Sequence, residues 1–89
     1  MQIDLFGLRA LVTGSTQGIG RAIAQALAAN GAEVVIHGRK AADIEQAIAT
    51  IRAVVPKARF AAAAGDVAMA EGVASIIEAA GDVDILVNS

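Results

Sequence analysis

Three glycines, Gly14, Gly18 and Gly20, separate two apolar patterns of different period. The apolar run at 10–12 is short and continuous, as in a buried strand, whereas apolar residues from Ile19 onward recur at helical spacing. Glycine adopts backbone dihedral angles that other residues avoid, so Gly14 suits a sharp turn out of the strand. The sequence therefore predicts a strand, a tight turn and a helix in close succession, which restricts the chain to folds built from such units.

Strand and helix patterns alternate along the rest of the chain. Apolar runs predict strands at 8–13, 33–37, 58–64 and 84–88. Between them, the spacing i, i+3, i+4, i+7 predicts three helices, whose buried faces would be Ile19, Ala22, Ile23, Ala26 and Leu27, then Ile44, Ala47, Ile48, Ile51 and Val55, then Val73, Ile76, Ile77 and Ala80. Gly31, Pro56 and Gly81 are expected to end these helices. The order βαβαβαβ predicts an α/β fold, a partial doubly wound parallel sheet with right-handed crossovers and spatial strand order 3-2-1-4.

Composition supports this fold and excludes several functions. The chain has 89 residues, enough for one small domain, and 56% of them are hydrophobic but only 2% aromatic. Strands covered by helices on both faces have such a composition. A net charge of −2 provides no basic surface for nucleic acid, and the absence of cysteine excludes disulfides and thiolate metal sites. With no signal-peptide pattern and no membrane-length apolar run, we expect a cytoplasmic protein without a metal.

The glycine turn has a specific chemical use. A turn of this kind between a strand and a helix binds the pyrophosphate of a dinucleotide, because helix N–H groups point at the anion. Gly18 would leave room for the diphosphate, and Gly20 would let the helix pack close to the sheet. Hydroxyls of Ser15 and Thr16 could contact the same phosphate, with helix capping as the alternative for Thr16. A turn that binds nothing is the alternative for the whole motif.

The segment Thr13-Gly14-x-x-x-Gly18-Ile19-Gly20 resembles the cofactor motif of the short-chain dehydrogenase/reductase family. Gly65-Asp66-Val67 is similar to the family's loop after the third strand, where the Asp contacts adenine, and 84–89 resembles its fourth strand, although Ser89 stands where a second Asn is usual. The resemblance covers the entire chain and implies a Rossmann-like sheet. It implies these cofactor-binding residues: Gly14, Ser15, Thr16, Gln17, Gly18, Ile19, Gly20, Asp66, Val67 and Asn88.

Some of these assignments have structural alternatives. Asp66 could be a loop residue before the third helix, and Asn88 could simply end its strand instead of holding the turn beside the nicotinamide ribose. We expect Thr13 to tie neighbouring loops together. His37, the single histidine, is expected at the rim of the cofactor site and away from hydride chemistry.

The second strand predicts which dinucleotide binds. NAD-binding versions of this fold place an acidic residue at the end of that strand, roughly 20 residues beyond the glycines. Here Gly38 occupies that position and Arg39 follows, so a guanidinium is available to hold a 2′-phosphate. Lys40 could assist or be a solvated loop charge, and Gln17 is neutral where many NADP-binding members carry a cation. The sequence therefore predicts NADP(H) in preference to NAD(H).

The resemblance also implies the activity of the complete protein. It would be an oxidoreductase that moves a hydride between nicotinamide and a small carbonyl or alcohol substrate, assembled as a homo-oligomer. The family's catalytic Ser and Tyr-x-x-x-Lys lie further downstream, and this chain has no tyrosine. We therefore expect residues 1–89 to be the dinucleotide-binding portion, with no catalytic residue and no turnover alone. The alternatives are a non-catalytic module that binds a dinucleotide or a subunit, and a structural segment with neither function.

Overall fold

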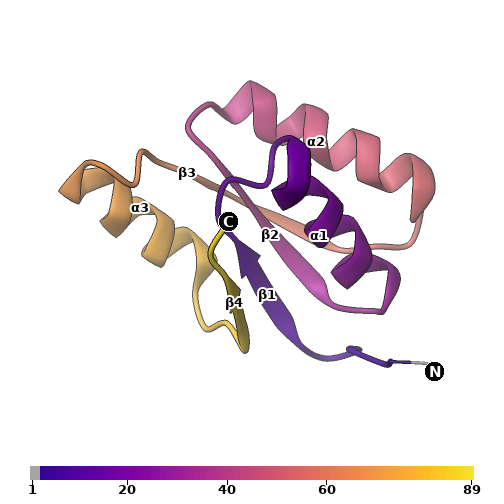
Figure 1. Cartoon of the computed structure of the whole chain (residues 1–89). Helices are drawn as coiled ribbons and strands as arrows, with labels where there is room; N and C mark the ends of the chain where they lie inside the picture. The colour runs from indigo at the N-terminus through magenta and orange to yellow at the C-terminus, as the bar shows by residue number, and fades with distance from the viewer. Residues whose placement is uncertain (1–2) are drawn as a thin grey trace.

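The computed structural model describes residues 3–89, which form one parallel sheet covered by helices (Figure 1). The sheet has four strands in the spatial order β3-β2-β1-β4. This order confirms the predicted partial doubly wound α/β fold. The strands are β1 (Arg9–Val12), β2 (Glu33–Gly38), β3 (Phe60–Ala64) and β4 (Ile85–Val87).

The two central strands carry most of the buried sheet. β1 pairs with β2 in parallel, from Arg9 opposite Glu33 to Val12 opposite Ile36. All residues of β2 after Glu33 are buried, because helices lie on both faces of the sheet and neighbouring strands lie at both edges. The apolar character of this strand therefore follows from its central position.

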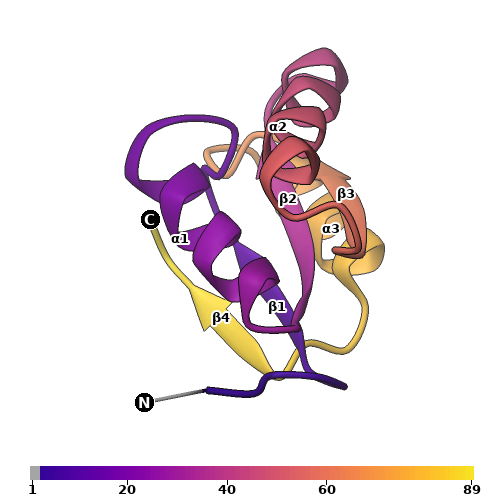
Figure 2. The same cartoon turned by 90° about the vertical axis from the view of Figure 1, so that its right-hand side faces the viewer.

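Three helices cover the two faces of the sheet unequally (Figure 2). α1 (Gly18–Ala29) and α2 (Ala41–Val54) pack on one face, and α3 (Ala70–Ala80) packs on the other. Alternate residues of β2 serve the two faces: Val34 and Ile36 pack beneath α1 and α2, whereas Val35 packs on the side of α3. The larger core therefore lies under α1 and α2.

The buried face of α1 agrees with the predicted one only in part. Ile23 and Leu27 are partly buried and pack against the larger core, as predicted. The fully buried residues are Gly20, Ala24 and Ala28, whereas Ile19 is 78% exposed and Ala22 and Ala26 are exposed too. Nearly every residue of this helix is small or apolar, so the periodicity did not determine which stripe would face the sheet. The stripe with the smallest side chains packs inward because it lets the helix axis approach the strands.

The other two helices agree better with the sequence. α2 buries Ile44, Ala47 and Ile51 as predicted, and Ile48 and Val55 are partly buried against the same core. α3 buries Ile76 and Ala80, whereas Val73 and Ile77 remain exposed. α3 packs mainly on β3, and Ile76 and Ala80 are the residues that join its core cluster with Leu11, Val35 and Ala63.

Glycines end two of the helices where expected. Gly31 follows α1 with a φ of 102°, and Gly81 follows α3 with a φ of 64°. Positive φ is the left-handed conformation that favours glycine at this position. Both predicted helix ends are confirmed.

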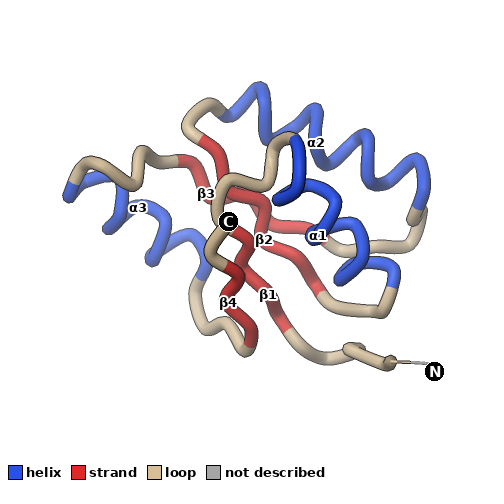
Figure 3. Tube along the Cα trace, viewed as in Figure 1, coloured by secondary structure: helices blue, strands red, loops and turns tan. Residues whose placement is uncertain are grey.

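The parallel arrangement brings the loops after β1, β2 and β3 to one end of the sheet (Figure 3). The last residue, Ser89, lies there too, because its N–H donates a hydrogen bond to Thr13 Oγ1 at 3.0 Å. Ligands of open parallel sheets bind at this carboxyl end of the strands. Across residues 3–89, no helix has the length and apolar character needed to cross a membrane.

Candidate functional site

The turn between β1 and α1 depends on its three glycines. Gly14 and Gly18 have φ angles of 59° and 63°, which an L side chain would strain. A Cβ at Gly20 would overlap the carbonyl group of Gly14 and lie 3.1 Å from Ser89 Oγ. Gly20 therefore lets α1 approach the turn itself, whereas the sequence predicted only a close approach to the sheet.

The first turn of α1 is arranged to receive an anion. Gln17 precedes the helix, and within the described residues its side chain makes no capping hydrogen bond. The first turn carries no acidic residue, so no carboxylate occupies the N-terminus. Thr16 lies one residue before the cap position, which removes capping as its role. Unpaired N–H groups and the helix dipole are therefore free to favour a negative group.

Ser15 has a different role from the predicted one. It is fully buried, and its Oγ accepts a hydrogen bond from the N–H of His37 at 2.9 Å. The N–H of Ser15 in turn donates to the carbonyl oxygen of His37 at 3.0 Å. The last β1–β2 pair is Val12 opposite Ile36, and beyond it Ser15 bonds to His37, the next residue of β2. The Ser15 hydroxyl is thus engaged with β2 and buried.

A cavity of about 270 Å³ lies where β1 and β2 end. The glycine turn and the predicted phosphate-binding cations line the same cavity. Its lining residues are Gly14, Thr16, Gln17, His37, Gly38, Arg39, Lys40 and Asp43. Asp43, from the first turn of α2, is a lining residue that the sequence did not suggest. Two cations and one carboxylate therefore surround the cavity.

Gly38 lines this cavity at a position that has no room for a side chain. A Cβ at that position would lie 2.5 Å from Thr16 Cγ2 and 3.3 Å from Ile44 Cγ1. Ordinary carbon–carbon contacts are about 3.5–4.0 Å, so the Thr16 methyl group occupies the space that a longer residue would need. The two loops that form the cavity are thus fitted to each other.

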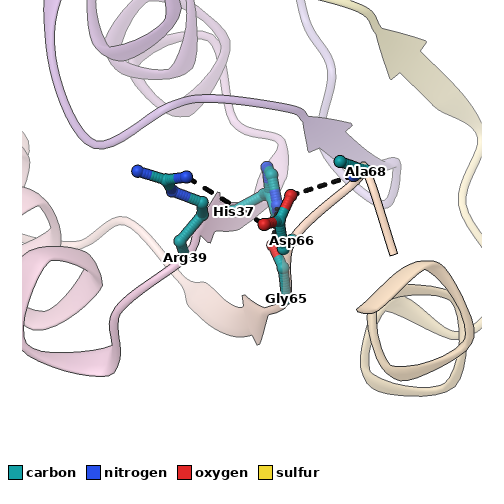
Figure 4. Close-up of polar contacts among 5 residues, drawn as sticks. All are labelled: His37, Arg39, Gly65, Asp66 and Ala68. Carbon is teal, nitrogen blue, oxygen red and sulfur yellow. Dashed lines mark hydrogen bonds and ion pairs between the residues drawn. The ribbon is translucent and has the colours of Figure 1, made fainter. Parts of the chain in front are cut away.

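The structure also brings together two residues predicted for different parts of the cofactor. Arg39 Nη1 lies 4.0 Å from Asp66 Oδ2, and the Arg39 side chain is 74% exposed whereas that of Asp66 is 41% exposed (Figure 4). The other Asp66 oxygen, Oδ1, accepts a hydrogen bond from the N–H of Ala68 at 2.9 Å. Asp66 therefore shapes the turn before α3 and faces the arginine at the same time.

The remaining predicted residues lie around this end of the sheet. Ile19 and Val67 are 78% and 60% exposed, so both apolar side chains are available for contact. Asn88 Oδ1 accepts a hydrogen bond from the hydroxyl of Thr13 at 3.1 Å. Since Thr13 also accepts the N–H of Ser89, it ties the end of β4 to the glycine turn, as the sequence predicted.

Two residues contribute more than the sequence suggested. A Cβ at Gly72 would overlap the backbone of Asp66, so this glycine lets α3 pack directly on the loop that follows β3. In the sequence, the position of Gly72 in the first turn of a predicted helix could have indicated this close packing. His37 was expected at the rim, but it is only 4% exposed and its ring points inward between two loops (Figure 4).

A parallel sheet whose first strand ends in a glycine turn at a helix N-terminus defines a Rossmann-like nucleotide-binding fold. The sequence matches the short chain dehydrogenase family over residues 9–89. The chain belongs to this family of oxidoreductases, whose members bind a nicotinamide dinucleotide.

Individual relatives agree with this assignment. The chain is 44% identical to the uncharacterised oxidoreductase YvaG of Bacillus subtilis (strain 168), covering 100% of this chain and 34% of the relative. It is also 44% identical to the gluconate 5-dehydrogenase of Gluconobacter oxydans (strain 621H), covering 97% of this chain and 36% of the relative. The crystal structure of L-sorbose reductase from Gluconobacter frateurii, complexed with NADPH and L-sorbose, is 35% identical with a TM-score of 0.88, covering 100% of this chain and 35% of that one. The chain thus spans about a third of the length of these proteins.

Proposed function

We propose that this chain forms the dinucleotide-binding part of an NADP(H)-dependent short-chain dehydrogenase. The observation that carries the proposal is the cavity at the ends of β1 and β2, where a side-chain-free Gly38 lies beside two cations, Arg39 and Lys40. The complete enzyme would act on a small carbonyl or alcohol substrate and form a homo-oligomer.

The turn after β1 would hold the pyrophosphate. Gly18 presents backbone without a side chain, and a Cβ built on it meets no atom within 4 Å among the described residues, so a diphosphate can approach. The free N–H groups at the start of α1 would donate to the phosphate oxygens, and the helix dipole adds about 0.3–1 kcal/mol. Thr16 and Gln17, which line the cavity beside this turn, could donate further hydrogen bonds.

Arg39 and Lys40 would select the 2′-phosphate. Both are exposed at the cavity, and no carboxylate occupies position 38, where an NAD-type site would hold the ribose hydroxyls. Binding would draw Arg39 from its distant, exposed partner Asp66, a contact that contributes little stability in water. Asp43, which lines the same cavity, would repel the phosphate, so we expect both cations to be needed.

The adenine and nicotinamide ends would lie on either side of the turn. Asp66 and Val67 follow β3, next to Arg39, and are proposed to contact adenine. Asn88 lies beside Thr13 at the end of β4, and Ile19 is exposed in the first turn of α1; both are proposed to contact the nicotinamide half. The NADPH bound to the L-sorbose reductase of similar fold supports the choice of cofactor.

We propose binding without turnover for these 89 residues. The dinucleotide, when bound, supplies or accepts a hydride at its nicotinamide ring. The tyrosine that serves as acid or base in this family has no counterpart here, because the chain contains no tyrosine. A module that binds a dinucleotide or a subunit without catalysis is the second candidate, and the small share of each relative that the chain covers favours testing it.

A titration with NADPH and with NADH tests the cofactor assignment. The chain has no Trp or Tyr, so the fluorescence of the bound cofactor can be followed without interference. Charge-assisted hydrogen bonds to a phosphate predict that NADPH binds at least about tenfold more tightly than NADH. Arg39→Asp should remove this preference. Lys57→Asp is the matched control, since it makes the same charge change in the exposed segment between α2 and β3, at the opposite end of the sheet.

Three results would contradict parts of the proposal. Equal affinity for the two dinucleotides would refute the assignment of NADP(H). Loss of preference in both variants would indicate a general charge effect and remove Arg39 as the specific ligand. Saturable binding of neither dinucleotide would refute autonomous binding by this chain.

A further inference from the structure

His37 lies inside the carboxyl end of the sheet and not at its rim. It is the residue before the last in β2, and it is 4% exposed. Figure 4 shows its side chain beside Gly65 and Asp66, the first residues after β3. A buried polar ring of this kind must find hydrogen-bond partners for both nitrogens, because unpaired polar groups are costly away from water.

Both ring nitrogens have such partners. The N–H of Gly14 donates to Nδ1 at 2.8 Å, and Nε2 lies 2.8 Å from the carbonyl oxygen of Gly65. A carbonyl oxygen only accepts, so Nε2 must carry the proton, and Nδ1 must be free of one to accept from Gly14. The two contacts thus fit one arrangement of the ring, in which Nε2 donates and Nδ1 accepts.

The ring joins two loops that the sheet leaves unconnected. Gly14 follows β1 and Gly65 follows β3, and these strands are separated by β2 in the order β3-β2-β1-β4. Main-chain bonds connect each loop to β2, from Ser15 N–H to the His37 carbonyl and from Gly65 N–H to the Gly38 carbonyl. The His37 side chain bridges from one loop to the other.

We propose that His37 is a positioning residue for the dinucleotide, whose ring fixes the phosphate-binding turn relative to the loop that carries Asp66. This inference rests on the proposed function, since it assumes that the two loops hold the two halves of one ligand. Small displacements of binding groups weaken ligands that contact several groups at once. Loss of one ring contact should weaken binding up to about tenfold, and loss of both should weaken it further.

Three substitutions at this position separate the two contacts. In His37→Asn, the amide oxygen can take the place of Nδ1 and keep the bond from Gly14, but the side chain does not reach Gly65. In His37→Gln, the amide nitrogen can take the place of Nε2 and keep the bond to Gly65 without an acceptor for Gly14. His37→Phe keeps a ring and makes neither contact.

The measurement is the dissociation constant of NADPH for each folded variant of the full chain, with urea unfolding followed in parallel. We expect about tenfold weaker binding in the Asn and Gln variants and a larger loss in the Phe variant. Ser75→Ala is the matched control, because it removes a side-chain hydrogen bond to the Ala64 carbonyl, next to Gly65, without touching His37. The control should lower the urea midpoint and leave NADPH affinity unchanged.

A spectroscopic measurement tests the geometry independently of any ligand. Nitrogen-15 spectra of the single histidine ring should show a protonated Nε2 and an unprotonated Nδ1. A ring protonated on Nδ1, or one that exchanges between tautomers, would overturn the inference.

The outcomes distinguish the inference from the proposed function. If the unsubstituted chain binds NADPH and all three His37 variants bind it equally well, the inference fails and the proposed function stands. If the unsubstituted chain binds neither NADPH nor NADH, autonomous dinucleotide binding by this chain fails and the positioning role fails with it. Should the Phe variant not fold, the Asn and Gln variants still decide, since each retains one contact.

Discussion

The fit between Gly38 and Thr16 leads to a prediction that can be tested by stability alone. Gly38 has no positive φ, so its backbone accepts alanine and the substitution adds a single methyl group. That Cβ would lie 2.5 Å from Thr16 Cγ2, roughly 1 Å closer than an ordinary carbon–carbon contact. Overpacking of this kind costs about 1–3 kcal/mol. We therefore expect Gly38→Ala to reduce the free energy of unfolding by that amount.

Thr16→Ser isolates the cause, because it removes Cγ2 and keeps the hydroxyl. The new Cβ would then have Ile44 Cγ1 at 3.3 Å and the Cβ of residue 16 at 3.7 Å as its nearest neighbours. Alanine also restricts the unfolded chain, which offsets about 0.4–1 kcal/mol. In the Thr16→Ser background, Gly38→Ala should therefore be close to neutral, and the double-mutant cycle should give a coupling of about 1–3 kcal/mol.

Urea unfolding followed by far-ultraviolet circular dichroism measures this cycle, since the chain lacks Trp and Tyr. Gly81→Ala serves as the control, because its φ of 64° strains alanine while its Cβ would meet nothing within 4 Å in the described residues. Its cost should be the same with and without Thr16→Ser. An equal cost of Gly38→Ala in both Thr16 backgrounds would refute the steric argument.

Three further substitutions test other parts of the site and the core. Gly20→Ala should prevent α1 from seating against the Gly14 carbonyl and abolish dinucleotide binding, which a cofactor titration would detect. Gly38→Asp combined with Thr16→Ser should favour NADH over NADPH in the same titration, whereas Gly38→Asp alone should lower stability more than it changes preference. Ile36→Ala removes a fully buried side chain from the larger core and should cost about 2–5 kcal/mol in urea unfolding.

The sequence predicted the strand order for a physical reason. Short apolar runs alternate with helical periods, and right-handed crossovers leave few ways to arrange four parallel strands. It predicted the buried face of α1 only in part, because a helix made of glycine, alanine and other apolar residues gives almost the same pattern on several faces. Ile23 and Leu27 pack against the core as predicted, but the fully buried stripe consists of the smallest residues, Gly20, Ala24 and Ala28.

The polar contacts of the site could not be predicted from the sequence, because they join residues that are far apart in the chain. Gly14 and His37 are 23 positions apart, and His37 and Gly65 are 28 apart. Whether Ser15 faces a phosphate or β2 depends on where β1 stops pairing, and strand ends are the least certain feature of a periodicity. A sequence motif therefore identifies the residues of a turn, but it does not predict which side chains make the hydrogen bonds that fix the turn.

The strand order nevertheless makes the position of His37 understandable. Side chains alternate along β2, so His37 shares a face with Val35, which packs beside Ala63 on the side of α3. Two residues beyond Val35, β1 has already ended at Val12 and turns away at Gly14. β3 still pairs with β2 through Ala63 and Ala64, and it turns away at Gly65. The turns leave one N–H and one carbonyl without a strand partner at this point. A histidine on β2 satisfies both groups at once, which is why a polar residue can lie next to the last position of the most buried strand of the sheet.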